Sequence, residues 1–301
     1  MDYSKIIEIN PENIQAYINR GQDFQKKEMY DNAIGDFNKA VELDPKNIMA
    51  LDNRARYNSY KKNYELALDD LNRIIELKPS LSVAYNNRGQ IFYQMKKYDK
   101  AIAEYNKSLL LDSKQIFVLY NRGEIYRFLG NYNQAISDFT AALKIKPDAS
   151  EAFIHRGSVY TEMVMYAQAV KDFNKSLELN PGSCTGYNGR GWAYALWGKA
   201  DLSIADAKKS IEICPNYAAA YDTLAYAYQK QKDYKNALIN YDMAIKILPV
   251  YGEAYFHRGQ AYFYLNKYDE AWRDVIKAQE LGEKIDSVFL KTLQNQSGRM
   301  K

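Results

Sequence analysis

The prolines of this 301-residue chain recur at a fixed interval. Successive prolines lie 34 residues apart, except for one gap in which Ser113 takes the vacant place. Proline lacks a backbone N–H and disfavours a helix in the residue before it, so each one marks the end of a helix. The spacing therefore predicts a tandem array of equal units. The seven prolines are Pro11, Pro45, Pro79, Pro147, Pro181, Pro215 and Pro249.

Eight units of 34 residues follow one another from Ile14 to Ile285 without insertion or deletion. Within each unit, apolar or small residues recur at places 4, 8 and 11 and again at places 20, 24 and 27. Both sets have helical spacing, and a break falls near place 15, where Gly130 and Gly198 stand. Each unit is therefore predicted to be a pair of antiparallel helices. The units are 14–47, 48–81, 82–115, 116–149, 150–183, 184–217, 218–251 and 252–285.

The columns inside the unit explain how the two helices pack. Place 8 is Gly or Ala throughout, and place 20 is Ala in all units except the sixth, which has Ser203. Small residues in both helices allow a close approach, and the aromatic residues at places 4, 11 and 24 fill the space around it. The second unit departs from this pattern, because Asn58 stands at place 11, where every other unit has an aromatic ring, and the aromatic residue is shifted to Tyr57.

These columns resemble the tetratricopeptide repeat family over essentially the whole chain. The resemblance implies an all-α fold, an α-solenoid in which eight helix-turn-helix units form a right-handed superhelix. It also implies a concave groove lined by the first helix of each pair. Residues 2–10 match the second-helix columns and are expected to form an N-terminal half-repeat or cap, and residues 286–295 a C-terminal cap helix, because terminal repeats need covering. Residues 1–301 are expected to form a single solenoid.

An arginine at place 7 occurs in seven units, and each of those units has an acid at place 23. The seventh unit has neither, since Leu224 and Asn240 stand there. A column of arginines suggests phosphate or carboxylate binding, but residues that change together favour a structural ion pair between the two helices. We therefore expect these arginines to belong to the scaffold. They are Arg20, Arg54, Arg88, Arg122, Arg156, Arg190 and Arg258.

A second basic column, at place 26, carries its own counter-charges. Lys39, for example, precedes Glu42 by three residues, a spacing that pairs side chains on one helix face. The net charge is only +4, with 41 basic and 37 acidic residues. A nucleic-acid surface would hold unneutralised cations, so no nucleic-acid partner is expected.

Place 6, which faces the groove in this family, holds asparagine in four consecutive units. An amide donates and accepts hydrogen bonds, so such a ladder is suited to binding the backbone of an extended peptide. The alternative is that asparagine is simply common in this chain. The predicted ladder consists of Asn19, Asn53, Asn87 and Asn121, followed by His155.

The other groove places predict a polar N-terminal half and an apolar pocket in units six to eight. Exposed aromatic residues in a groove suit peptide anchoring, whereas packing between units is the alternative. The further candidate binding residues are Arg56, Tyr93, Tyr120, Arg127, Trp192, Tyr226, Phe256, Phe263 and Tyr264. No three successive units supply the basic carboxylate clamp of the chaperone-binding members of the family, so a chaperone tail is not an expected ligand.

No catalytic residue, metal site or cofactor site is predicted. His155 and His257 lie three units apart and are interpreted as groove hydrogen-bonding residues. Cys184 and Cys214 stand at opposite ends of one unit, which an antiparallel pair brings together. A disulfide is conceivable there, but free thiols are the expectation.

The predicted function is that of a protein interaction scaffold or adaptor that holds an extended peptide or a partner helix in the groove, and not that of an enzyme. The alternative is a substrate-recruiting arm of a larger enzyme, such as a glycosyltransferase. No apolar run approaches the length of a membrane span, and no signal peptide precedes the repeats, which favours a cytoplasmic location. The sequence leaves the partner and the oligomeric state open.

Overall fold

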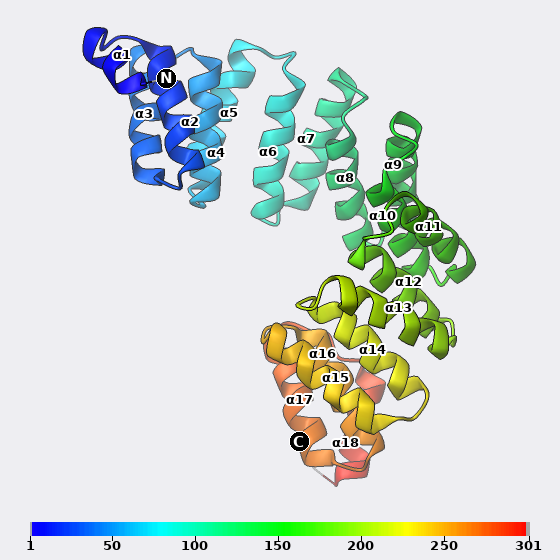
Figure 1. Ribbon diagram of the computed structural model, residues 1–301. Helices are drawn as coiled ribbons and strands as arrows, with labels where there is room; N and C mark the ends of the chain where they lie inside the picture. The colour runs from blue at the N-terminus through cyan, green and yellow to red at the C-terminus, as the bar shows by residue number, and fades with distance from the viewer. Residues whose placement is uncertain (1, 299–301) are drawn as a thin grey trace. The chain divides into compact units, whose positions relative to one another are not determined.

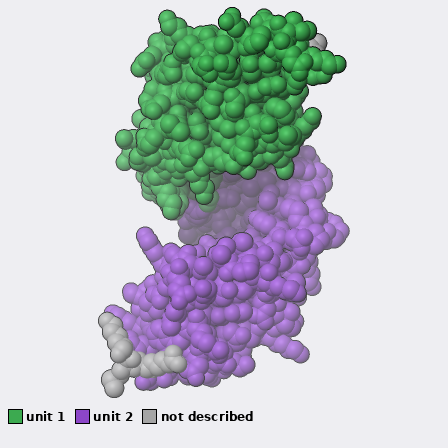
Figure 2. All heavy atoms as spheres, turned by 90° about the vertical axis from the view of Figure 1, so that its left-hand side faces the viewer, with its two compact units in different colours: residues 1–145 green, residues 146–301 purple. Residues whose placement is uncertain are grey.

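The computed structural model describes residues 2–298, which contain eighteen α-helices and no strand. The chain divides into two compact units, residues 1–145 and 146–301, coloured green and purple in Figure 2. The all-α repeat fold predicted from the 34-residue spacing is confirmed. Helices of the first unit are α1 (Tyr3–Ile9), α2 (Ile14–Lys26), α3 (Tyr30–Leu43), α4 (Ile48–Tyr60), α5 (Tyr64–Leu77), α6 (Ser82–Gln94), α7 (Tyr98–Leu111), α8 (Ile116–Phe128) and α9 (Tyr132–Ile145).

The second unit repeats the same alternation of a 13-residue and a 14-residue helix before its last two helices. Its helices are α10 (Ser150–Glu162), α11 (Tyr166–Leu179), α12 (Cys184–Leu196), α13 (Ala200–Ile213), α14 (Ala218–Lys230), α15 (Tyr234–Ile247), α16 (Gly252–Tyr264), α17 (Tyr268–Glu280) and α18 (Ser287–Ser297).

Each turn between the two helices of a pair has one residue with a left-handed backbone, always at place 15. In the first repeat, the Glu28 N–H donates to the Gln25 carbonyl and the Met29 N–H donates to the Phe24 carbonyl. This is the Schellman arrangement, which satisfies the free carbonyls at the end of a helix. The eight residues are Glu28, Lys62, Lys96, Gly130, Val164, Gly198, Lys232 and Asn266.

Glycine at place 8 makes room for the aromatic ring at place 24 in several repeats. A Cβ atom added to Gly21 would lie 2.6 Å from a ring carbon of Phe37, and one added to Gly89 would lie 2.7 Å from Tyr105. Both rings are almost fully buried. The close approach predicted from the columns is therefore confirmed, with the ring itself occupying the space above the glycine.

Within each compact unit most of the first helices touch the first helix of the next repeat. In the first unit α2 contacts α4 and α4 contacts α6, and in the second α10 contacts α12, α12 contacts α14 and α14 contacts α16. Figure 1 shows α2, α4 and α6 side by side. This row of first helices is the inner face of each unit, and the second helices form the outer face.

The end helices cover the exposed sides of the array. Helix α1 packs against α2 and α18 packs against α17. Leu293 of α18 is fully buried in a cluster with Ala271 and Val275 of α17. The Trp272 Nε1–H also donates to Ser297 Oγ at 3.0 Å.

Candidate functional site

The arginines at place 7 form the predicted ion pairs. Arg54 Nε and Nη2 donate to the two oxygens of Asp70 at 2.8 and 2.6 Å. The hydrogen bond to Asp70 raises the pKa of Arg54 more than burial lowers it. The same pairing joins Arg20–Asp36, Arg88–Glu104, Arg122–Asp138, Arg156–Asp172, Arg190–Asp206 and Arg258–Asp274. The arginine column is therefore part of the scaffold, as predicted.

Most of these arginines also reach back to the preceding repeat, which the sequence reasoning missed. Arg54 Nη1 donates to Asn38 Oδ1 at 3.4 Å. Place 25 of the sequence indicates this contact. In each repeat that is followed by an arginine at place 7, place 25 holds a side chain that can accept a hydrogen bond. In the repeat that is followed by Leu224, place 25 holds Lys208. Further contacts of this kind are Arg20–Ser4, Arg88–Asn72, Arg122–Asn106, Arg190–Asn174 and Arg258–Asp242.

Four of the six basic residues at place 26 are neutralised on the outer face. Lys39 Nζ lies 2.7 Å from Glu42 Oε1, and the same pairing joins Lys175–Glu178, Lys209–Glu212 and Lys277–Glu280. The prediction that these lysines have their own counter-charges is confirmed.

Three of the four predicted ladder asparagines hydrogen-bond inside the chain. Asn53 is only 5% exposed, and its Nδ2 donates to the Met49 carbonyl at 2.8 Å. Asn19 accepts from Gln15 at 2.8 Å, and Asn87 Nδ2 donates to Asp52 at 2.9 Å. The fourth, Asn121, has no side-chain hydrogen-bond partner in residues 2–298 and lines a cavity.

Two cavities adjoin on the inner face of the first unit. One, of about 270 Å³, is lined by Arg56 and Ser59 of α4 and by Asn87, Gln90 and Gln94 of α6. The second, of about 390 Å³, is lined by Gln90, Tyr93 and Gln94 of α6 and by Asn121 and Glu124 of α8. Since Gln90 and Gln94 belong to both, we treat the two cavities as one surface and call it the amide groove.

The amide groove combines free amides with a few paired polar groups. Gln90 and Gln94 are exposed, and Gln94 Oε1 accepts from Ser59 Oγ at 3.0 Å. Glu124 is paired with Arg127, whose Nη2 lies 2.9 Å from it. Beneath one end of the groove, burial raises the pKa of Asp52, while Asn87 and Arg56 oppose the shift.

Sequence reasoning named Asn87, Asn121, Arg56 and Tyr93 among the candidate residues, and all four line the amide groove. It also noted that the N-terminal groove places are polar. Ser59, Gln94 and Glu124 were not named, although they occupy the groove-facing places 12, 13 and 9. Tyr120 lies outside this set, with its ring centroid 6.4 Å from the core residue Phe139.

In the second unit, Trp192, Tyr226 and His257 come together on the inner face. The ring centroids lie 4.8 Å apart for Trp192–Tyr226 and 5.2 Å for Tyr226–His257. His257 Nδ1 lies 3.0 Å from an oxygen of the buried Asp222. Burial alone would lower the pKa of His257, but the charge and hydrogen bond of Asp222, with Glu253 and Glu283 nearby, raise it overall.

The remaining candidates of the second unit contact other parts of the chain. Phe256 and Phe263 pack edge-on against Phe289 of the C-terminal helix, at 5.6 and 5.5 Å. Tyr264 is 56% exposed and stacks on Tyr234 at 5.7 Å. His155 is partly exposed on α10. The predicted apolar pocket of units six to eight stays a prediction.

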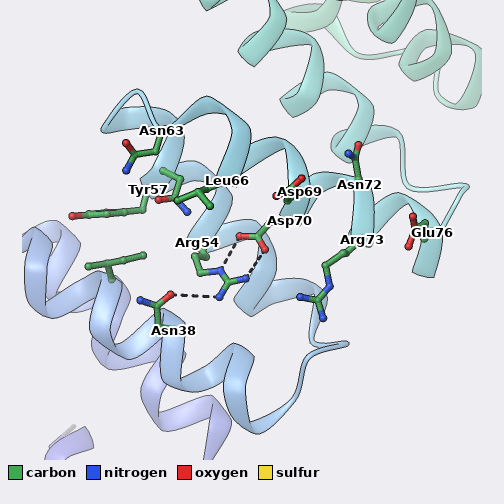
Figure 3. Close-up of a pocket in the computed structure, with 12 residues that line it drawn as sticks. Asn38, Arg54, Tyr57, Asn63, Leu66, Asp69, Asp70, Asn72, Arg73 and Glu76 are labelled. Atoms are coloured by element: carbon green, nitrogen blue, oxygen red, sulfur yellow. Dashed lines mark hydrogen bonds and ion pairs between the residues drawn. The ribbon is translucent and has the colours of Figure 1, made fainter.

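A further cavity lies on the outer face of the second repeat and has a volume of about 790 Å³. Figure 3 shows Arg54, Tyr57 and Leu66 around it, with Arg54 held by its bonds to Asp70 and Asn38. Sequence reasoning had noted the unusual Asn58, which lines this cavity, but had not predicted a cavity there.

The expectation of free thiols is wrong in this structure, because Cys184 and Cys214 form a disulfide. The start of α12 and the end of α13 lie side by side, where Ser210 Oγ donates to the Cys184 carbonyl at 2.8 Å. The Cα atoms are 6.0 Å apart, a distance that a disulfide spans. Disulfides persist in oxidising compartments, so the cytoplasmic location stays a prediction.

Within residues 2–298, no group of three or more His, Cys, Asp or Glu side chains is arranged to hold a metal ion. None of the helices in that range combines the length and apolar character needed to cross a bilayer.

The helix pairs and their shared columns define an α-helical repeat protein. Models of the tetratricopeptide repeat match residues 14–47, 80–148, 120–183, 185–217, 218–250 and 252–281. The chain therefore belongs to the tetratricopeptide repeat family. No curated protein matches it.

Solved structures share the fold at low sequence identity. A tetratricopeptide repeat protein from Parabacteroides merdae is 22% identical, with a TM-score of 0.65 over 95% of this chain and 99% of that one. Cut9, in the Cut9–Hcn1 assembly of the APC/C, is 14% identical with a TM-score of 0.68, over 98% of this chain and 58% of that chain. YrrB, described as having an unusual peptide-binding site, is 23% identical with a TM-score of 0.50, over 61% of this chain and 95% of that one.

Proposed function

We propose that this protein is a non-catalytic adaptor that binds an extended segment of a partner protein in the amide groove. The observation that carries the proposal is the pair of adjoining cavities on α4, α6 and α8, lined by Gln90, Gln94 and Asn121. A carboxamide offers both donors and an acceptor, so it suits a peptide backbone, whose polar groups also alternate.

The dimensions of the groove indicate a short segment. Packed helices lie roughly 8–10 Å apart, so the span from α4 to α8 is about 20 Å. An extended chain advances about 3.3 Å per residue, and the groove accommodates about six residues. The half-exposed Tyr93 offers a side-chain anchor beside the amides.

Charge contributes little to this recognition. Arg56 is exposed at the α4 end, but Glu124 at the α8 end is paired with Arg127. The groove therefore favours an uncharged segment that is recognised through its backbone. YrrB supports the proposal to the extent that a protein of the same fold is described as binding a peptide.

The test is selection of binders from a displayed library of 12-residue peptides, followed by titration of the selected peptides by calorimetry. We expect Gln90→Ala combined with Asn121→Ala to weaken binding by tenfold or more. The matched control, Asn133→Ala with Gln134→Ala, removes the same two side-chain types from exposed positions on the outer helix α9 and should leave affinity unchanged.

Asn53 is excluded from the test set because its amide is buried and bonded to the Met49 carbonyl. If the selected peptides bound both double variants with the wild-type affinity, the amide groove would not be the binding surface. A loss confined to variants of Trp192 or Tyr226 would move the site to the second unit instead.

A further inference from the structure

In six repeats of this array the arginine at place 7 lies over an aromatic ring of its own repeat. The ring stands at place 11 for Arg20, Arg122 and Arg258 and at place 4 for Arg88, Arg156 and Arg190. Seven of the eight repeats carry an aromatic ring at place 11, and five of the seven rings are tyrosines: Phe24, Phe92, Tyr126, Tyr160, Tyr194, Tyr228 and Tyr262.

The second repeat lacks this ring. Asn58 takes its place, and Leu51 stands at place 4, where most repeats also have an aromatic residue. Among residues 2–298, Arg54 is accordingly the one place-7 arginine whose guanidinium lies over no aromatic ring; the other six each face at least one. The guanidinium face of Arg54 is therefore left without the partner that its counterparts have.

Asn58 is a buried polar side chain with no partner in the described part of the chain. It is 7% exposed, and no side-chain hydrogen bond reaches its carboxamide. Its carboxamide is not among the fully enclosed polar atoms without a partner in residues 2–298, so it keeps contact with solvent in the cavity. Since Asn58 lines the outer cavity, its unused donors and acceptor are available to a molecule inside it.

The cavity is enlarged where the ring is missing. The outer cavity of the fifth repeat, lined by Arg156, Asp172 and Lys175, has about 460 Å³ and does not include the ring of Tyr160. In the second repeat the cavity has about 790 Å³ and extends to Asn58 and Tyr57. Leu66, labelled beside it in Figure 3, is 56% exposed and adds apolar surface at its rim.

We propose that the outer cavity of the second repeat receives a tyrosine side chain of a partner protein, which takes the place that the other repeats fill with their own rings. The ring would lie against the guanidinium of Arg54, and the phenol would exchange hydrogen bonds with the carboxamide of Asn58. Tyrosine is the indicated occupant because most of the rings at place 11 are tyrosines and because a phenol both donates to and accepts from a carboxamide.

This site is distinct from the amide groove. Its lining residues come from α3, α4 and α5, and none of them lines either inner cavity. A partner could therefore bind both faces of the second repeat. Binding in the outer cavity and binding in the amide groove can be tested independently.

The test uses p-cresol as the probe, with binding followed by ligand-observed NMR and the site located through the side-chain amide signal of Asn58. Wild type should bind p-cresol with a millimolar dissociation constant. Asn58→Tyr, which supplies the missing ring from the chain itself, should weaken binding by at least tenfold and raise the thermal midpoint. The groove variant Gln90→Ala with Asn121→Ala should bind p-cresol like wild type.

A second variant separates the ring from the hydroxyl. Asn58→Ala keeps the space but removes the amide, so it should bind toluene and p-cresol equally, whereas wild type should prefer p-cresol. The tripeptide Ac-Gly-Tyr-Gly-NH2 should bind wild type and Ac-Gly-Ala-Gly-NH2 should not. Absence of p-cresol binding, equal binding by Asn58→Tyr, or binding of p-cresol without the tyrosine tripeptide would each overturn the proposal.

Discussion

Val164 holds the least favourable backbone position in the array, and its replacement by glycine should stabilise the protein. It has φ of 62° at place 15 of its repeat, where Gly130 and Gly198 occupy the corresponding turns. The left-handed conformation brings the Cβ atom close to the backbone, and branching at Cβ makes the crowding worse. The turn keeps this conformation because the Met165 N–H must reach the Tyr160 carbonyl, at 2.8 Å.

The magnitude follows from three contributions. A non-glycine residue in the left-handed region costs roughly 1–2 kcal/mol, which Val164→Gly removes. The greater freedom of glycine in the unfolded chain costs about 0.5–1 kcal/mol. The valine side chain is 67% exposed, so little burial is lost. The net stabilisation should be about 0.5–1 kcal/mol.

Urea denaturation monitored by helical circular dichroism measures this change. The midpoint should rise for Val164→Gly while the slope stays constant, because the surface exposed on unfolding is nearly the same. The reverse variant, Gly130→Val, should lower the midpoint by a comparable amount. A lower midpoint for Val164→Gly, or no effect of Gly130→Val, would refute the assignment of strain to this turn.

Three further predictions concern the second unit, each measured by urea denaturation. Arg190→Ala leaves the carboxylate of Asp206 buried and unpaired and should lower the free energy of unfolding by about 3–5 kcal/mol. Adding Asp206→Asn to this variant should recover much of the lost stability. If it recovered none, the two residues would not act as a pair. Reduction of the Cys184–Cys214 disulfide, whose cysteines are 30 residues apart, should cost roughly 3–4 kcal/mol in the wild type and nothing in the double alanine variant. Because the pKa of His257 is raised above 6.5, its charged form stabilises the fold below that pH. The contribution is lost as the pH rises through the raised pKa, and His257→Gln should flatten the decline in stability above about pH 6.5.

The helix pairs were predictable from the sequence because their determinants repeat. A single proline is weak evidence for the end of a helix, but proline at place 32 in six of the eight units is strong evidence. The ion pairs were predictable for the same reason, since Leu224 and Asn240 depart from their columns together. Contacts that recur in every repeat require the same residue types at the same places, and such a recurrence can be recognised in the sequence alone.

The candidate sites were only partly predictable because side-chain hydrogen bonds depend on geometry that a column does not contain. Asn53 and Asn121 occupy the same place in their repeats, yet Asn53 is buried against the Met49 carbonyl and Asn121 lines a cavity. The difference comes from neighbours such as Gln22, which donates to Asn53. A residue type at a groove-facing place therefore identifies a candidate, and its hydrogen bonds determine whether it is available to a ligand.

A residue that departs from its column is interpreted together with its contact partner in the same repeat, which either changes with it or stays the same. Leu224 replaces an arginine, and its partner acid is replaced by Asn240, so the change is compensated inside the repeat. Asn58 replaces an aromatic ring, but the adjoining Arg54 and its ion pair with Asp70 are retained. A compensated departure preserves packing, whereas an uncompensated one leaves a buried amide, an uncovered guanidinium face and a cavity together. In this repeat array, the second repeat is therefore the place where a ligand can supply the aromatic ring that the chain lacks at Asn58.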